Sequence, residues 1–83
     1  MKKIVFTQKA MSKITSARRI ISQDKIINII EDYMIMYPAE QNKTAIPFIR
    51  NNTECYILVS IEEKRIVVVT VSCSAVYKKI VKH

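Results

Sequence analysis

The chain of 83 residues contains no glycine. Glycine adopts a positive φ more easily than any other residue, so every tight turn must here be made by Asn, Asp, Ser, Lys or Pro. The glycine-rich phosphate loops of nucleotide-binding folds are excluded as well. The pair Asn51-Asn52 lies between two strand-like runs. Because Asn tolerates a positive φ, we predict a tight turn at this pair.

The length allows one domain with a thin core of two layers. Hydrophobic residues make up 49% and charged residues 25% of the chain, a composition typical of a folded globule. No apolar run approaches the ~18 residues that a membrane span needs, and no signal-peptide pattern follows Met1. We therefore predict a single domain over residues 1–83, in the cytoplasm and without a membrane segment.

The first half of the chain has the apolar periodicity of two helices. Residues 3–6 are a short strand or an extended lead-in. Thr7 and Ser22 are N-cap candidates, and Pro38 cannot continue the second helix. The short join near residues 20–23 favours an antiparallel helix hairpin. The apolar stripe of the first helix is Ala10, Met11, Ile14, Ala17 and Ile21, and that of the second is Ile26, Ile29, Ile30, Tyr33, Met34 and Tyr37.

From Thr44 the pattern changes to strands. Residues 45–50, 54–61 and 65–73 each have the composition of a strand, and Pro47 indicates that the first of these lies at a sheet edge. The last run is apolar on both faces, as central strands are. Strict alternation there places Ile66 and Val68 opposite Val67, Val69 and Val71.

The predicted fold class is therefore α+β. An antiparallel helix hairpin forms one layer, and a three- to four-stranded antiparallel sheet forms the other. The order of elements is (β)ααβββ, followed by a basic C-terminal tail.

Cys55 and Cys73 fall in strand-like runs and lack metal-ligand spacing. We predict two buried thiols of a cytosolic protein, with a disulfide as the alternative. The single histidine is His83, the last residue. So few scattered ligands predict no metal site, and no motif indicates a cofactor.

The 14 basic and 7 acidic residues leave a net charge of +7, which is unevenly distributed. Residues 1–25 carry a net +6 and residues 66–83 a net +3, whereas residues 26–40 carry −3. Such basic ends indicate attraction to phosphates, and the alternative is a solvated basic face without a ligand. The candidate nucleic-acid-binding residues are Lys9, Lys13, Arg18, Arg19, Arg50, Lys64, Lys78 and Lys79.

No strong catalytic motif is present, but several side chains could converge if the tail folds back across the sheet. Arg65 begins the last strand, and Tyr77 and His83 follow that strand. Such a set can cleave RNA without a metal, because the ribose 2′-hydroxyl is an internal nucleophile. Cations stabilise the transition state, and Tyr or His moves a proton. Arg65, Tyr77 and His83 are therefore candidate catalytic residues, with a solvated rim as the alternative.

Three short motifs resemble a known family. Residues 6–14 (FTQKAMSKI), 18–24 (RRIISQD) and 67–71 (VVVTV) are similar to a group of small bacterial and phage domains placed near the RelE-like toxins. RelE-like toxins are small ribonucleases of toxin–antitoxin pairs. The resemblance covers residues 4–74 and implies the same order of elements. It also implies an RNA-cleaving protein that acts on mRNA or the ribosome, with an antitoxin as partner.

The resemblance departs at Lys9, where that group usually has a His. This departure favours an alternative function, in which a non-catalytic phage or plasmid protein inhibits a host factor by binding it or its nucleic acid. A third hypothesis is a homodimer. The second apolar face of the strand at residues 65–73 needs the tail, an antitoxin or a second copy to cover it.

Overall fold

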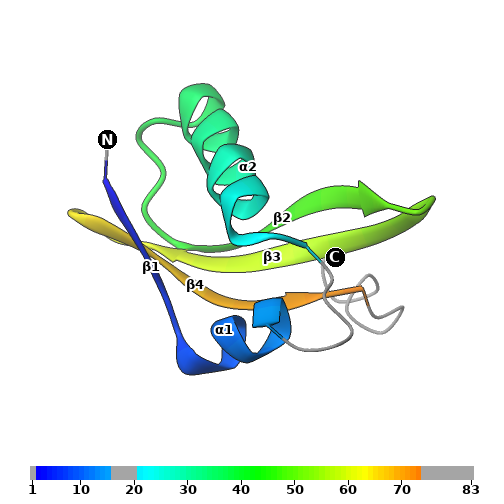
Figure 1. The fold of residues 1–83 in the computed structure, drawn as a ribbon. Helices are drawn as coiled ribbons and strands as arrows, with labels where there is room; N and C mark the ends of the chain where they lie inside the picture. The colour runs from blue at the N-terminus through cyan, green and yellow to red at the C-terminus, as the bar shows by residue number, and fades with distance from the viewer. Residues whose placement is uncertain (1, 16–20, 74–83) are drawn as a thin grey trace.

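The computed structural model of the chain describes residues 2–15 and 21–73. These residues form two helices and four strands, and the protein is α+β (Figure 1). The elements are β1 (Lys3–Phe6), α1 (Gln8–Thr15), α2 (Gln23–Met36), β2 (Lys43–Arg50), β3 (Thr53–Ile61) and β4 (Arg65–Ser72).

The four strands form one sheet in the order β1-β4-β3-β2, so that β1 and β2 lie at its two edges. The antiparallel meander β2-β3-β4 is confirmed, as is the edge position of the strand that holds Pro47. The prediction of a wholly antiparallel sheet is wrong, because β1 pairs with β4 in parallel, with Lys3 opposite Arg65.

The parallel pair follows from the path of the chain. The two helices form the crossover between β1 and β2, and a crossover of this kind returns the next strand in the same direction. The meander then reverses twice, so β4 runs in the direction of β2 and therefore of β1.

The two helices pack on different strands of the sheet. α1 lies against β4, and α2 lies against β2 (Figure 1). Among the described residues each helix packs mainly on the sheet, which differs from the predicted helix hairpin. The predicted extension of the first helix to Ala17 lies outside the described residues. One core cluster joins both helices to the sheet, and it consists of Ala10, Ile14, Ile21, Ile26, Ile30, Met34, Ile46, Ile57, Val59, Ile61, Ile66, Val68 and Val71.

Both predicted N-caps are confirmed. Thr7 Oγ1 accepts a hydrogen bond from the Ala10 N–H at 3.1 Å, and Ser22 Oγ accepts one from the Lys25 N–H at 3.2 Å. Each bond satisfies a donor that the first turn of a helix would otherwise leave unpaired. These caps therefore set where α1 and α2 begin.

The turn between β2 and β3 is made by Asn51 and Asn52, as predicted. Their φ angles are 50° and 62°, both in the left-handed region. Two consecutive positive φ angles are typical of the type I′ turn that best joins antiparallel strands. Without glycine, Asn is the residue that adopts this backbone at the lowest cost.

β4 contains one residue more than β3 can pair. The register skips Val69, which makes a β-bulge. Beyond a bulge the side chains change face, so Val71 is buried in the same core as Val68. The expectation that Val71 lies on the face opposite Val68 is therefore wrong.

Cys55 and Cys73 form a disulfide, with Cα atoms 4.1 Å apart. The prediction of two thiols is therefore wrong, and the alternative is the one observed. The strand register explains the bond. Tyr56 pairs with Ser72, which places Cys55 and Cys73 directly opposite each other on neighbouring strands. Cysteine spacing alone does not reveal such a register.

Candidate nucleic-acid interface

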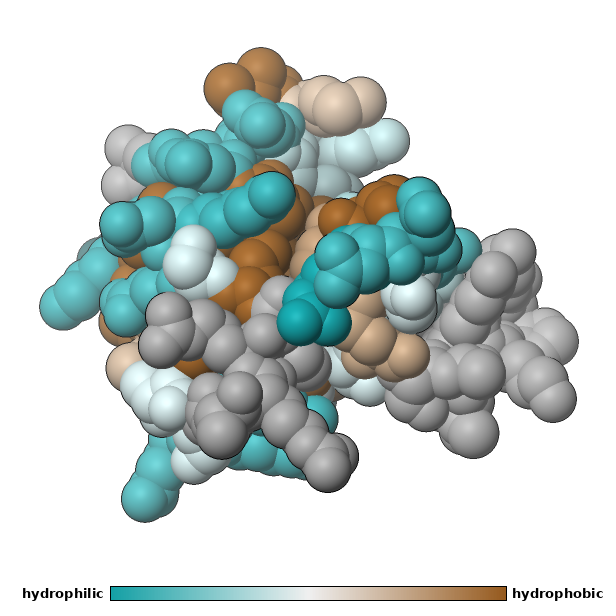
Figure 2. Space-filling model, turned by 45° about the vertical axis from the view of Figure 1, so that its right-hand side comes forward, coloured by the Kyte–Doolittle hydropathy of each residue, from teal (hydrophilic) through white to brown (hydrophobic). Residues whose placement is uncertain are grey.

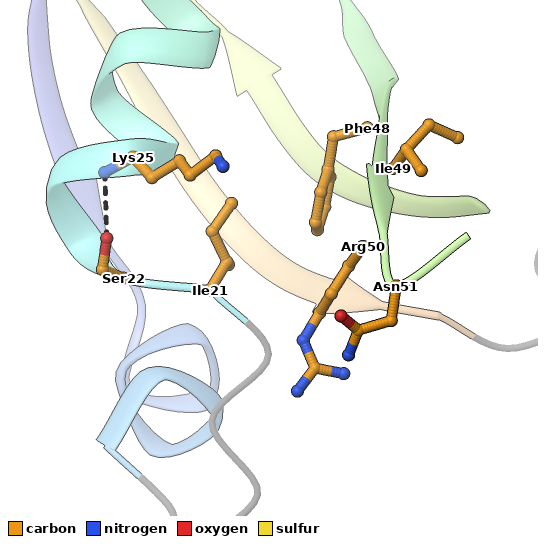
Figure 3. A pocket seen from close by; sticks show the side chains of 7 residues that line it. All are labelled: Ile21, Ser22, Lys25, Phe48, Ile49, Arg50 and Asn51. Atoms are coloured by element: carbon orange, nitrogen blue, oxygen red, sulfur yellow. Dashed lines mark hydrogen bonds between the residues drawn. The ribbon is translucent and has the colours of Figure 1, made fainter. Parts of the chain in front are cut away.

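A pocket lies between the N-terminal end of α2 and the end of β2 (Figure 3). Its volume is about 250 Å³. Pockets that enclose a whole small molecule measure about 300–1,000 Å³, so this one suits a single charged group better than a complete ligand. We call it the Lys25–Arg50 pocket, and it is lined by Ile21, Ser22, Lys25, Phe48, Ile49, Arg50 and Asn51.

Two cationic side chains reach this pocket from different elements. Lys25 extends from the first turn of α2 toward β2, and Arg50 points from the end of β2 into the space below it (Figure 3). Asn51 adds an amide beside Arg50. Within the part of the chain that the structure describes, no carboxylate lines the pocket. Two positive charges facing one cavity create a potential that attracts an anion.

The local sequence explains why these side chains meet. Ser22 caps α2, which places Lys25 in the first helical turn, where the helix dipole adds positive potential and Asp24 offsets part of it. The turn at Asn51 ends β2 directly after Arg50. Phe48 packs against the core and forms the apolar wall of the pocket.

The other predicted nucleic-acid contacts are spread over the molecule. Lys9 and Lys13 lie on α1, where Lys9 is exposed and Lys13 is half-buried. Lys64 is exposed in the turn between β3 and β4. Arg50 is the only one of the predicted cations that lines the Lys25–Arg50 pocket within the described residues. Arg18, Arg19, Lys78 and Lys79 lie outside those residues, as do Tyr77 and His83.

The candidate catalytic residue Arg65 lies far from this pocket. Arg50 pairs with Thr53 at the first residue of β3, whereas Arg65 follows the last residue of that strand. The nine residues of β3 span ~27 Å. Arg65 also donates a 2.7 Å hydrogen bond from Nε to Glu62 Oε1, an exposed ion pair. The structure therefore does not bring Arg50 and Arg65 to one surface.

Two tyrosines hold their protons tightly. The Tyr56 hydroxyl donates to Glu54 Oε1 at 2.5 Å, and this hydrogen bond, together with burial, raises the pKa of Tyr56 to about 12. Burial raises the pKa of Tyr33, and its hydrogen bond to Glu40 raises that pKa further. Neither phenol is deprotonated near neutral pH, so neither acts as a general base there.

Within residues 2–15 and 21–73, no three His, Cys, Asp or Glu side chains gather where a metal ion could bind. In the same part of the chain, no helix combines the length and the apolar character that crossing a membrane requires.

Sequence reasoning did not assign a role to Lys25, Ser22 or Asn51 at this site. Ser22 and Asn51 are recognised from sequence as a cap and a turn, and Lys25 follows that cap by three residues. Their meeting depends on how α2 lies against β2, which local patterns do not contain.

Comparisons with known proteins add no relative. No family model, curated protein or solved structure was found that matches the chain. The resemblance to RelE-like toxins therefore stays a prediction.

Proposed function

We propose that the chain is an RNA-binding domain that holds backbone phosphates at the Lys25–Arg50 pocket. The observation that carries the proposal is the convergence of Lys25 and Arg50 on one cavity. Phosphate contacts by Lys and Arg supply most of the sequence-independent affinity of proteins for nucleic acids. The net charge of +7 adds long-range attraction to the same class of ligand.

RNA is the nucleic acid that we propose, and the support for it is the similarity of residues 6–14, 18–24 and 67–71 to domains placed near the RelE-like toxins. The pocket is large enough for a phosphate, and its Phe48 wall is apolar. Exposed bases of single-stranded RNA stack on such walls, whereas those of a duplex do not reach them. Single-stranded RNA, free or on the ribosome, is therefore the proposed ligand.

Binding without cleavage is the form of this function that the described residues favour. Arg65, the one candidate catalytic residue among those described, pairs with Glu62 and lies at the other end of β3 from the pocket. Cleavage of the RNA would depend on Tyr77 and His83, which lie outside the described residues. Incubating the RNA with wild type, Tyr77→Phe and His83→Ala tests this directly. Intact RNA in all three supports binding alone, and cuts that disappear in either variant would identify a ribonuclease.

The binding prediction concerns Lys25→Gln. We expect this change to lower the affinity for a labelled single-stranded RNA, because it removes one phosphate contact. The slope of log K against log salt should become shallower by about 0.7 for each lost contact with a single strand. Fluorescence anisotropy between about 50 and 200 mM salt measures both quantities.

Lys64→Gln is the matched control, because it removes the same charge from an exposed lysine at the other end of β3. Its RNA affinity and salt slope should stay near those of the wild type. Equal losses of RNA affinity in Lys25→Gln and Lys64→Gln would mean that positive charge anywhere on the surface contributes equally. The pocket would then not be the binding site. A duplex DNA bound more tightly than the RNA would reject RNA as the ligand.

A further inference from the structure

A second hollow lies along the side of α2 that borders β2. Its volume is about 320 Å³, and its lining is mostly apolar. Among the described residues, its lining shares no member with that of the Lys25–Arg50 pocket and includes a single charged side chain, Asp32. We call it the α2–β2 groove, and it is lined by Ile29, Asp32, Tyr33, Met36, Tyr37, Ile46 and Pro47.

α2 carries more apolar surface than the core uses. Its core stripe is Ile26, Ile30 and Met34, all of them buried. A second stripe, which includes Met36 and Tyr37, lines the groove at helical spacing. Met36 is 70% exposed and Tyr37 is 47% exposed. Figure 2 shows brown and tan side chains at the top of the molecule, at the height of the C-terminal end of α2 in Figure 1, where Ile35 and Met36 are both exposed. Contiguous exposed apolar side chains of this kind mark interaction sites.

One wall of the groove is held in place before any partner arrives. The rings of Tyr33 and Tyr37 lie 4.8 Å apart with their planes tilted by 41°. The Tyr33 hydroxyl donates to the Glu40 carboxylate, which fixes the ring from its far end. A wall that is already ordered loses little conformational entropy on binding.

The groove differs in charge from the rest of the chain. Residues 26–40 contain Glu31, Asp32 and Glu40 and no Lys or Arg. Asp32 lines the groove, and Glu40 is bound to its wall through Tyr33. This local negative charge repels RNA and attracts a cationic partner. A second copy placed symmetrically would bring two acidic stretches together, which is unfavourable.

The edge of β2 limits the shape of the partner. An extended peptide could pair with an edge strand, but Pro47 lies within β2 and lacks the N–H that such pairing uses. A helix needs no backbone pairing with the sheet. From Ile29 to Tyr37 the groove follows α2 and its C-cap over nine residues, a rise of ~12 Å, which is the length of about two helical turns.

We propose that the α2–β2 groove binds a basic amphipathic helix of a partner protein. The apolar face of that helix packs between Met36 and Pro47, and its Lys or Arg side chains lie beside Asp32. This mode of recognition needs anchors at i, i+3 or i+4, and i+7 on the partner. The interaction is separate from RNA binding, since no described residue lines both hollows.

The test uses the full chain and three synthetic peptides in isothermal titration calorimetry. The first peptide is a helix of Leu, Lys and Ala with leucines at i, i+3, i+4 and i+7. The second has the same composition in scrambled order, and the third has Glu in place of Lys. We expect a Kd in the micromolar range for the first peptide, and binding at least tenfold weaker for the other two.

Two variants locate the peptide on the protein. Met36→Gln and Asp32→Lys should each weaken binding of the first peptide at least tenfold, and the uncharged change Met36→Gln should leave RNA affinity unchanged. Ile35→Gln is the matched control, because Ile35 is 77% exposed on the same helix and does not line the groove. It should bind as the wild type does.

Equal binding of the scrambled or the Glu peptide would overturn the proposal. So would equal losses in Met36→Gln and Ile35→Gln, because the groove would then have no special role. A wild-type dimer that becomes a monomer in Met36→Gln, seen by analytical ultracentrifugation, would assign the groove to a second copy instead. Loss of RNA affinity in Met36→Gln would assign it to RNA.

Discussion

Thr7 joins three elements through hydrogen bonds. Its N–H donates to the Val68 carbonyl at 3.0 Å, and its Oγ1 donates to the Val69 carbonyl at 2.7 Å. The same oxygen accepts from the Ala10 N–H at the start of α1. Thr7 therefore fixes the end of β1, the beginning of α1 and the bulge of β4 with respect to one another.

Replacing this hydroxyl tests its importance. We expect Thr7→Val to lower the free energy of unfolding by about 2 kcal/mol, roughly half from the lost N-cap and half from the lost bond to Val69. Urea unfolding followed by circular dichroism measures the change. Thr7→Ser keeps the hydroxyl and should stay close to the wild type. A Thr7→Val protein as stable as Thr7→Ser would show that the hydrogen bonds contribute nothing.

The raised pKa of Tyr56 predicts how the free energy of unfolding depends on pH in alkaline solution. Its pKa is raised from the ordinary value of 10.0 to about 12 by Glu54 and by burial. Because the folded state holds this proton more tightly than the unfolded state, the resulting stabilisation is complete below pH 10. It is lost as the pH rises from about 10 to 12.

We therefore expect the urea midpoint of the wild type to fall as the pH rises above 10. In Tyr56→Phe the fall should be smaller, because the titrating hydroxyl is gone. Absorbance of tyrosinate gives an independent measurement, in which one residue of the wild type titrates near pH 12. A Tyr56→Phe protein with the same alkaline loss as the wild type would assign that loss to other groups.

At the scale of elements, the disulfide joins two strands that are already neighbours in the sheet. Cys55 lies in β3 and Cys73 directly follows β4, with 18 residues of sequence separation between them. Closing a loop of this length in the unfolded chain is worth ~3 kcal/mol in the chain-entropy model. Such bonds persist in oxidising compartments, whereas the cytosol keeps most thiols reduced. The stability of β3 and β4 thus depends on the redox state around the protein.

Reduction should show this dependence. We expect dithiothreitol to lower the free energy of unfolding of the wild type by about 3 kcal/mol. The double variant Cys55→Ala/Cys73→Ala should be insensitive to the reductant, which controls for other effects of the reagent. Identical urea midpoints of the wild type with and without dithiothreitol would contradict the expectation.

The elements that could be predicted from sequence are those whose limits are set by neighbouring residues. Ser22 caps α2 through Lys25, three residues away, and Asn51-Asn52 forms its turn without distant contacts. The bulge at Val69 was not predictable, because no Gly or Pro marks it and Thr7 holds it from 62 residues away. The disulfide likewise depends on the register that this bulge helps to define.

At the scale of the whole molecule, the two proposed binding surfaces carry charges of opposite sign. The Lys25–Arg50 pocket is cationic, and the α2–β2 groove is apolar with Asp32 as its charged residue. Both use α2 and β2, but at different positions along them. The protein could therefore hold a phosphate backbone at one site and a cationic helix at the other.

The sequence could predict only that the candidate site would contain basic residues and roughly where in the chain they would lie. The excess of positive charge pointed to Arg50, which does line the pocket. It pointed equally to Arg65, which the sheet places at the other end of β3. Charge counting does not distinguish the two, because it contains no information about which end of a strand a side chain occupies.

The pairing of the first strand with the last has a consequence for the newly made chain. Lys3 and Arg65 are partners in the sheet but are separated by 62 residues. At synthesis rates of about 5–20 residues per second, β1 waits about 3–12 s before its partner strand exists. During that time Thr7 has no β4 carbonyl to bind, and the apolar side chains of α1 have no sheet to cover them. The N-terminal part of this protein is thus translated first but cannot take its place in the sheet until β4 has been made.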